Sequence, residues 1–207
     1  MKRIADSTVR RLSMYLRLLE RCEANGQLTI SSDDLAKQGG TTSAQVRKDL
    51  SFFGSFGKRG LGYSVPELAA EVREILGLRR RWRVSIVGAG KIGAALAQYR
   101  GFGQRGFDIV AVYDSSPEKI GLQWGELTVR DVNALDGDLT ADAPDIVVLA
   151  IPSENAQALV DRVVAAGIHA ILSFVPAQLH APADVSIKTV NMAMELEGLS
   201  YWLSNRD

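Results

Sequence analysis

Apolar residues follow two different spacings along the chain, one before about residue 80 and one after it. In the first part they recur three and four residues apart, as on the inner face of a helix, for example at Val9, Leu12, Leu16 and Leu19. In the second part, short apolar runs such as 84–87 and 109–113 alternate with helical patterns, which predicts a parallel sheet with helices packed on it. We therefore expect a helical domain at 1–80, an α/β domain at 81–190 and a C-terminal helix within 191–207.

Capping residues and glycine turns divide the first domain into helices. Ser7, Ser32 and Thr42 each precede a helical pattern, which is the position of an N-cap. A tight turn at 39–41 separates the second helix from the third, which is expected at 43–50. Three helices with a tight turn between the last two form a helix-turn-helix pattern.

A glycine-punctuated segment at 54–63 suits a β-hairpin wing, and Ser64 then opens a fourth helix as part of a capping box. Glutamine and arginine on a recognition helix can reach base edges, lysine more often meets phosphate, and an arginine on a thin wing can enter the minor groove. Each residue taken singly could equally be a solvated surface side chain. The residues expected to contact DNA are Ser43, Gln45, Arg47, Lys48, Lys58 and Arg59.

The two parts of the chain carry opposite charge, although the whole is neutral. Residues 1–83 contain 16 Lys and Arg against 9 Asp and Glu, a net charge of +7, and the remainder carries −7. A basic N-terminal domain on an acidic body is the electrostatic pattern of a nucleic-acid-binding protein. A solvated basic face would have the same composition.

The stretch 83–114 contains the motif around which the second domain is organised. A strand at 84–87 is followed by Gly88, Gly90 and Gly93, a helix-forming run and a second strand that ends on Asp114. In this context the first glycine permits a tight turn, the second lets the backbone approach a pyrophosphate, and the third lets the helix pack on the strand. The terminal carboxylate is placed to bind an adenosine ribose.

These features predict an NAD(H) site, with a bare structural turn as the alternative interpretation of the glycines. Asp114 would repel a 2′-phosphate, and Ser115-Ser116 supplies no arginine to neutralise one, so we expect NAD(H) rather than NADP(H). The apolar strand at 145–152 ends where Rossmann ligands bind. The residues expected to bind the cofactor are Gly88, Ala89, Gly90, Lys91, Ile92, Gly93, Asp114 and Pro152.

The pattern weakens at 121–136, where no strong period is visible, and then returns. A helix is expected at 154–166, and strands at 170–174 and 187–190 complete the sheet. The apolar surface of the last helix predicts packing across a homodimer interface, and docking on the chain's own sheet is the alternative. The apolar residues of that helix are Met192, Leu196, Leu199, Tyr201, Trp202 and Leu203.

Several function classes find no support in the sequence. No metal-ligand cluster or Ser/His/Asp arrangement is visible, and His169 and His180 lie beside a strand and in a loop, so we expect no catalytic residue and no metal. No apolar stretch is long enough for a bilayer, and the N-terminus lacks the apolar middle of a signal peptide. The single cysteine, Cys22, suits a reducing compartment, so the expected location is the cytoplasm.

The sequence resembles the Rex family of redox-sensing transcriptional repressors along essentially its whole length. The resemblance rests on the strings at 15–17, 45–51, 80–82 and 101–103, on the glycine-containing matches at 54–55, 57, 59–60 and 62–63, and on Val87-Gly88 with Gly90 and Gly93. It implies a winged helix-turn-helix joined to a Rossmann domain with a swapped C-terminal helix. It also implies a homodimer that binds an inverted-repeat operator in double-stranded DNA. In the family NADH releases the repressor from DNA, whereas NAD+ permits or favours binding.

The resemblance further implies a redox switch formed by Tyr99 beside the nicotinamide, Arg17 on the first helix and the residue before the final helix. The family commonly has an aspartate at that last position, and this chain has Asn191. An amide can hydrogen-bond both partners, but charge-assisted bonds are about twice as strong as neutral ones. The redox response is therefore expected to be weaker or to rest on other contacts.

Two other classes remain open. A small NAD-dependent oxidoreductase would turn over NADH and bind no operator, but it needs an acid or base beside the hydride site. A nucleotide-binding interaction module, such as one for a CoA-like ligand, would bind without operator or redox preference. Asp114 argues against the second class, and the missing acid or base argues against the first.

Overall fold

The computed structural model describes residues 4–57 and 61–206, and it divides the chain into two compact units, Met1–Arg80 and Arg81–Asp207. The first unit has one hydrophobic core, and the second has two, one on each face of a sheet. The α/β architecture with a helical N-terminal unit, predicted from the apolar spacing, is confirmed.

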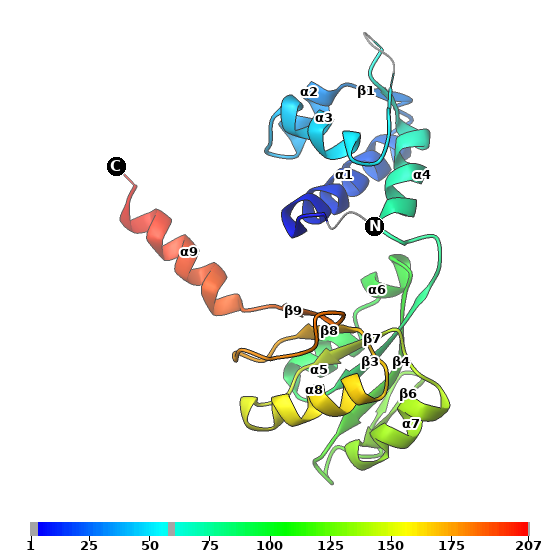
Figure 1. Cartoon of the computed structure of the whole chain (residues 1–207), viewed down its shortest axis with the longest axis vertical. Coiled ribbons are helices and arrows are strands. Elements are labelled where there is room, and N and C mark those ends of the chain that lie inside the picture. Colours follow the sequence, from blue (N-terminus) through cyan, green and yellow to red (C-terminus); the bar gives the residue numbers. More distant parts are fainter. Residues whose placement is uncertain (1–3, 58–60, 207) are drawn as a thin grey trace. The chain divides into compact units, whose positions relative to one another are not determined.

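The first unit contains the helix-turn-helix predicted from the caps and turns (Figure 1). Its core is built by residues of α1 at helical spacing, including Leu12, Leu16 and Leu19, and it also buries Cys22. Val9, predicted on the same inner face, is exposed. Its elements are α1 (Asp6–Ala24), β1 (Thr29–Ile30), α2 (Ser32–Gln38), α3 (Ser43–Ser51), β2 (Tyr63–Ser64) and α4 (Val65–Ile75).

One predicted cap is present and three are not. The Thr42 hydroxyl accepts a hydrogen bond from the Gln45 backbone N–H at 3.2 Å and so caps α3. Helix α1 begins one residue before Ser7, and α2 is capped by Ser31 rather than by Ser32. Ser64 occupies the N-cap position of α4, but within the described residues its side chain makes no capping bond.

The wing has a different strand partner from the one predicted. Strand β2 pairs antiparallel with β1, so the segment at 28–30, expected as an extended link, supplies the partner strand. Gly62 has a φ of +77°, and a Cβ there would lie 2.5 Å from the Ile30 carbonyl oxygen, so this close approach of the two segments requires glycine. The predicted DNA contacts Lys58 and Arg59 lie outside the described residues.

The second unit has a seven-stranded sheet in the order β5-β6-β4-β3-β7-β8-β9, in which only the β5–β6 pair is antiparallel. From β6 to β9 this is the strand order of a dinucleotide-binding Rossmann fold. The strands are β3 (Trp82–Val87), β4 (Phe107–Asp114), β5 (Gln123–Trp124), β6 (Leu127–Asp131), β7 (Ile146–Leu149), β8 (Ala170–Ser173) and β9 (Ser186–Thr189).

Helices cover the two faces of this sheet unequally. In Figure 1, α7 and α8 lie over one face, and α5 lies on the other. The segment 121–136, where no period was visible, forms β5, β6 and the start of α7, and the helix predicted from 154 begins with a 3₁₀ turn. The helices are α5 (Lys91–Ala97), α6 (Gly101–Gln104), η1 (Val132–Ala134), α7 (Leu135–Ala141), η2 (Ser153–Asn155), α8 (Ala156–Ala165) and α9 (Met192–Ser204).

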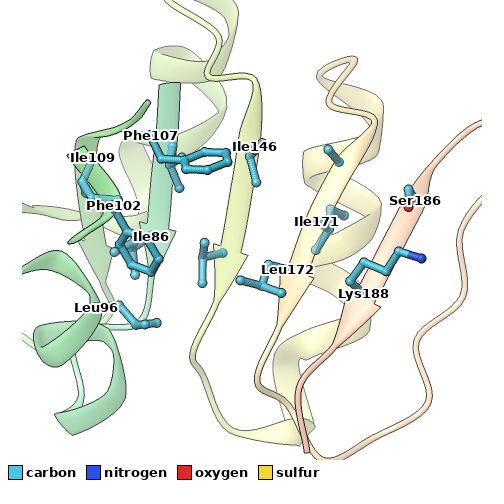
Figure 2. Close-up of a pocket in the computed structure, with 13 residues that line it drawn as sticks. Ile86, Leu96, Phe102, Phe107, Ile109, Ile146, Ile171, Leu172, Ser186 and Lys188 are labelled. Atoms are coloured by element: carbon cyan, nitrogen blue, oxygen red, sulfur yellow. The ribbon is translucent and has the colours of Figure 1, made fainter. Parts of the chain in front are cut away.

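The less covered face carries an apolar hollow of about 300 Å³ across the strands, from β4 to β9 (Figure 2). Figure 2 shows Phe107 on β4, Ile146 on β7 and Leu172 on β8. Lys188 lies on the edge strand β9. The segment between β8 and β9, described throughout, contains no helix that would cover this face. Apolar side chains are therefore left open on one side of the sheet.

Helix α9 is a second apolar surface. None of its residues, all of which the structure describes, is buried, and its large apolar side chains are 57% to 72% exposed. Helix α9 is therefore not docked on the sheet of its own chain, which was the alternative considered from the sequence.

Candidate nucleotide pocket and DNA-binding surface

A pocket of about 770 Å³ lies at the carboxyl ends of β3, β4 and β7. The chain leaves β3 toward β4 on one side and reaches β7 on the other, so the order of connections reverses here. Such a reversal is where open α/β sheets bind ligands. The volume is also in the range of small-molecule sites.

The glycine turn forms one wall of the pocket, and its glycines have different reasons to lack a side chain. Gly88 has a φ of +109°, and a Cβ at Gly93 would lie 1.8 Å from the Gly88 carbonyl oxygen. Among the described residues, no atom lies within 4 Å of the position that a Cβ at Gly90 would take. Gly90 therefore keeps open space at the mouth of the pocket, which suits the close approach of a pyrophosphate to the backbone.

Asp114 closes the pocket at the end of β4 and is only 8% exposed. Its Oδ2 accepts a hydrogen bond from the Ala89 backbone N–H at 2.6 Å and one from Lys119 Nζ at 3.1 Å. Its Oδ1 accepts one from the Ser116 backbone N–H at 2.8 Å. A carboxylate has about four acceptor positions, so one remains for a ribose hydroxyl.

These donors keep Asp114 ionised. Burial by itself raises the pKa of a carboxyl group, but the hydrogen bonds from the backbone of Ser116 and Ala89 and from Lys119 outweigh burial and hold the pKa of Asp114 below its ordinary value. Lys119 also places a cation at the Asp114 end of the pocket, and the sequence analysis, which considered only Ser115 and Ser116 there, did not identify it. The turn that follows β4 brings Lys119, five residues after Asp114, back to the pocket. This turn is visible in the sequence and could have identified Lys119.

Asp114→Asn is expected to weaken NADH and NAD+ binding by about tenfold each, because the amide lacks the charge and presents N–H groups where N–H donors now point. Isothermal titration calorimetry measures both affinities, and thermal unfolding checks that the fold survives. Lys119→Met is the matched variant, which removes one donor and leaves the carboxylate. Equal affinities of Asp114→Asn and the parent chain would contradict the ribose assignment.

The other predicted cofactor residues also surround this pocket. Lys91 and Ile92 are exposed on its rim at the start of α5, and Pro152 lines it from the end of β7. Ala89 contributes its backbone N–H to Asp114. Residues of α8 that the sequence did not identify, Leu159 and Arg162, line the far side, and the Arg162 guanidinium is bound to Asp136 and to the Val132 carbonyl oxygen.

Two members of the predicted redox switch lie in the second unit. Tyr99 follows α5, is 60% exposed and packs edge-to-face on Phe102 with ring centroids 5.1 Å apart. Asn191 is the N-cap of α9, and its Oδ1 accepts from the backbone N–H groups of Ala193 at 3.0 Å and Met194 at 3.4 Å. The third member, Arg17, is exposed on α1 in the first unit.

The predicted recognition helix, α3, presents Arg47 and Lys48 to solvent. Arg47 also donates to the Ser32 hydroxyl of α2 at 2.8 Å, and Ser43 is half-buried at the start of the helix. Gln45, expected to contact DNA, is half-buried, and its Nε2 donates to the Asp49 carboxylate at 2.8 Å. The reason is helical spacing, since 45 and 49 lie on one face.

Other classes of site were sought in the described part of the chain. No group of three or more His, Cys, Asp and Glu side chains there could hold a metal ion. His169 pairs with Asp184 at 3.3 Å, and His180 is exposed in the loop before β9. Of the helices within residues 4–57 and 61–206, none is both long and apolar enough to cross a bilayer.

The fold and the two sites define a class: a chain in which a helix-turn-helix unit is followed by a Rossmann domain with a dinucleotide-type pocket. Two family descriptions match its parts separately. A family described as "Putative DNA-binding protein N-terminus" matches residues 3–51, and one described as "CoA binding domain" matches residues 79–177.

Whole-length relatives identify the family. The chain is 41% identical to the redox-sensing transcriptional repressor Rex of Desulfitobacterium hafniense, over 99% of this chain and 97% of the relative. It is 43% identical to Rex of Carboxydothermus hydrogenoformans, over 96% of each. The chain belongs to the Rex family of redox-sensing transcriptional repressors.

Solved structures of relatives agree in fold over the whole chain. A Rex-family repressor, RSP, in complex with β-NAD+ and operator DNA superposes with a TM-score of 0.93 at 38% identity, covering 98% of this chain and 94% of that one. RSP in complex with β-NADH superposes with a TM-score of 0.89 at 36% identity, covering 98% and 95%.

Proposed function

We propose that this chain is an NADH- and NAD+-responsive transcriptional repressor that binds an inverted-repeat operator and leaves it when NADH is bound. The observation that carries the proposal is the Gly88–Asp114 pocket, in a chain that also contains a helix-turn-helix unit. The relatives named above that were solved with NAD+, NADH and operator DNA support both halves of the proposal.

On the DNA side, α3 is the recognition helix and its exposed cations are the contacts. Arg47 is suited to bidentate bonds with a guanine edge in the major groove, and Lys48 is suited to a phosphate. The net charge of +7 over residues 1–83 attracts the phosphate backbone. DNA affinity is therefore expected to fall steeply as salt rises.

On the cofactor side, the pocket residues hold the part that NAD+ and NADH share. Asp114 accepts from the adenosine ribose, and the turn at Gly90 leaves room for the pyrophosphate. The two cofactors differ only at the nicotinamide, and a ligand shifts a conformational equilibrium only by its differential affinity for the two states. We therefore assign the switch to Tyr99, Asn191 and Arg17 rather than to the ribose site.

We propose that the pocket acts by binding the cofactor, which changes DNA affinity, and does not catalyse a reaction on it. A hydride-transfer enzyme needs a positioned acid or base at the nicotinamide. Neither His169 nor His180 is among the residues that line the Gly88–Asp114 pocket, which supports this proposal. The proposed location of such a regulator is the cytoplasm.

The function is tested with a duplex that the pure protein selects from a random pool. Its dissociation constant is measured by fluorescence anisotropy with no ligand, NAD+, NADH, NADPH and CoA in turn. NADH is expected to weaken binding about tenfold or more relative to NAD+, which is a common size for coupling between two sites. Failure to select any duplex, or equal affinities with NADH and NAD+, would overturn the proposal. A CoA effect alone would point to the interaction-module class.

Asn191→Asp is expected to increase the ratio of operator affinities with NAD+ and NADH by about three- to tenfold, because it restores a charge-assisted partner for the switch. Aspartate is as good an N-cap as asparagine, so α9 keeps its start. The anisotropy ratio is compared with that of Asn191→Ser, which also caps but has neither charge nor amide. A ratio unchanged from the parent chain would exclude residue 191 from the switch.

We further propose that the chain is a homodimer in which α9 and the apolar hollow of the sheet are both covered. Each is an exposed apolar surface in the single chain, and contiguous patches of this kind mark association sites. The apolar stripe of α9 is formed by Met192, Leu196, Leu199 and Leu203.

Leu199→Glu is expected to raise the dimer dissociation constant at least about a hundredfold, because two protomers each bury a charge in place of a leucine. Sedimentation velocity at micromolar protein measures the shift to monomer. Ser204→Glu adds the same charge at a position of α9 that is not three or four residues from any member of that stripe, and it is expected to leave the dimer intact. A monomeric parent chain, or a dimeric Leu199→Glu, would show that α9 is not the interface.

A further inference from the structure

The first unit contains a buried carboxylate that connects the first helix to the recognition helix. Asp49 of α3 is 0% exposed and is surrounded by donors from two helices. Arg11 of α1 binds it with two nitrogens, Nε at 2.6 Å from Oδ2 and Nη2 at 2.7 Å from Oδ1. The hydroxyl of Tyr15 donates at 3.1 Å, and that of Thr8 donates at 3.4 Å. From α3 itself, Gln45 donates at 2.8 Å.

The group is charged and nearly sealed from water. Burial raises the pKa of a carboxyl group, but the hydrogen bonds from Arg11, Gln45 and Tyr15 outweigh it and hold the pKa of Asp49 below its ordinary value. Burial and the bond to Asp49 raise the pKa of Tyr15 to about 12. Arg11 keeps a quarter of its side chain exposed, and Tyr15 is fully buried. Asp49 is therefore an anion held by a cation and three neutral donors.

Such an arrangement restricts how α3 can sit on α1. Apolar contacts between helices tolerate small rotations and slides, because dispersion attraction has little direction. A bidentate arginine–carboxylate pair is directional, and any rotation of α3 that breaks it leaves a buried charge without its partner. Asp49 lies one residue after Lys48 and two after Arg47, so this anchor acts within one turn of the exposed cations.

Gln45 takes part in this anchor and not in the outer surface. A glutamine that reads adenine uses both its amide nitrogen and its amide oxygen at the base edge. Here the amide nitrogen of Gln45 is donated to Asp49, on the inner side of the helix. Arg47 and Lys48 face outward instead.

We infer that Asp49 is a positioning residue for DNA recognition, which sets the orientation of α3 through Arg11 and Tyr15, and that Gln45 serves this anchor instead of reading a base. The inference rests on the proposed DNA binding. On this inference the outward side chains of α3 contact the DNA. Gln45 and Asp49, which face inward, fix the orientation of the helix that carries them.

The test uses the full-length protein, the duplex selected by the parent chain and the set of its single-base-pair variants. Gln45→Met keeps the size and helix propensity but removes the donor, and operator affinity is expected to fall about three- to tenfold, as for the loss of one buried hydrogen bond. Asp49→Asn is expected to lower affinity further. In the double variant the two effects are expected not to add, because both act on one contact. Arg47→Ala serves as the comparison for a side chain that contacts a base directly. For that variant, the loss of affinity is expected to depend on one base pair of the duplex.

Two controls separate the outcomes. Gln38→Met makes the same chemical change at an exposed position of α2 and is expected to leave affinity unchanged. NADH affinity, measured by calorimetry, is expected to be unchanged in Gln45→Met. The inference is overturned if Gln45→Met binds as tightly as the parent chain, if its loss is confined to one base pair, or if its effect adds to that of Asp49→Asn. If Asp49→Asn does not fold, the base-pair scan of Gln45→Met decides alone. A parent chain that selects no duplex refutes the proposed function instead.

Discussion

Gly93→Ala is expected to destabilise the second unit by about 3 kcal/mol or more and to abolish NADH binding. A Cβ at this position would lie 1.8 Å from the Gly88 carbonyl oxygen and 3.0 Å from the Gly88 carbonyl carbon, and both atoms belong to the backbone. The glycine turn must therefore move away from α5, which changes the pocket wall. Thermal unfolding followed by circular dichroism measures the loss of stability, and calorimetry measures the loss of cofactor binding.

Gly90→Ala is the matched control for this substitution. Among the residues that the structure describes, no atom lies within 4 Å of the position that its Cβ would take, so the fold is expected to remain as stable as that of the parent chain. The added methyl group would occupy the space proposed for the pyrophosphate, so NADH affinity is expected to fall. A stable Gly93→Ala, or a Gly90→Ala that binds NADH normally, would contradict the assignment of this turn.

Arg11→Met is expected to destabilise the first unit by about 3 kcal/mol, because it leaves the Asp49 carboxylate buried without its cation. The methionine fills part of the same volume. The loss of unfolding free energy therefore reflects the missing charge more than a change in packing. Chemical denaturation followed by circular dichroism measures it. Arg10→Met changes a neighbouring exposed arginine and is expected to be neutral. Equal losses in the two variants would show that the buried pair contributes nothing specific.

Lowering the pH is expected to reduce the difference in unfolding free energy between the parent chain and Arg11→Met. The pKa of Asp49 is held below the value of about 3.9 that it has when unfolded, so the pair stabilises the folded state above about pH 4 and less as the pH falls through the folded pKa. Arg11→Met removes the largest of the contributions that lower the pKa of Asp49, so this pKa is expected to be higher in the variant and protonation is expected to cost the variant less stability. The two stabilities are therefore expected to converge below about pH 4. A constant gap between pH 7 and pH 3 would contradict this account.

The start of the second unit, from its first strand to Asp114, was predictable from local sequence patterns. The run 84–87, the three glycines and Asp114 lie within one stretch, and their spacing alone predicted the strand, the turn and the position of the acid. Segment 121–136 was not predicted because β6 buries only Val129 and α7 buries only Leu135 and Leu139, too few positions to make a period.

The sites were less predictable than the elements that carry them. Lys119 meets Asp114 because the turn at 115–118 brings it back, and that turn was the sequence's one indication of the contact. Arg11 and Asp49 are 38 residues apart, and nothing near either of them indicates that they form a pair. Gln45 was expected to contact DNA because a glutamine on a recognition helix can reach base edges, whereas Asp49, one helical turn away, supplies a buried acceptor for its amide.

The sequence by itself determined the two-unit organisation, the helix-turn-helix, the Rossmann motif and the family, because helix and strand periods, caps and glycine turns act over a few neighbouring residues. Only the tertiary structure decided which strand the wing pairs with, which polar groups are buried together and which apolar surfaces remain open. Those outcomes depend on contacts between residues distant in sequence, where the cost of burying a charge or leaving a donor unpaired is settled by the partner that the fold brings into reach.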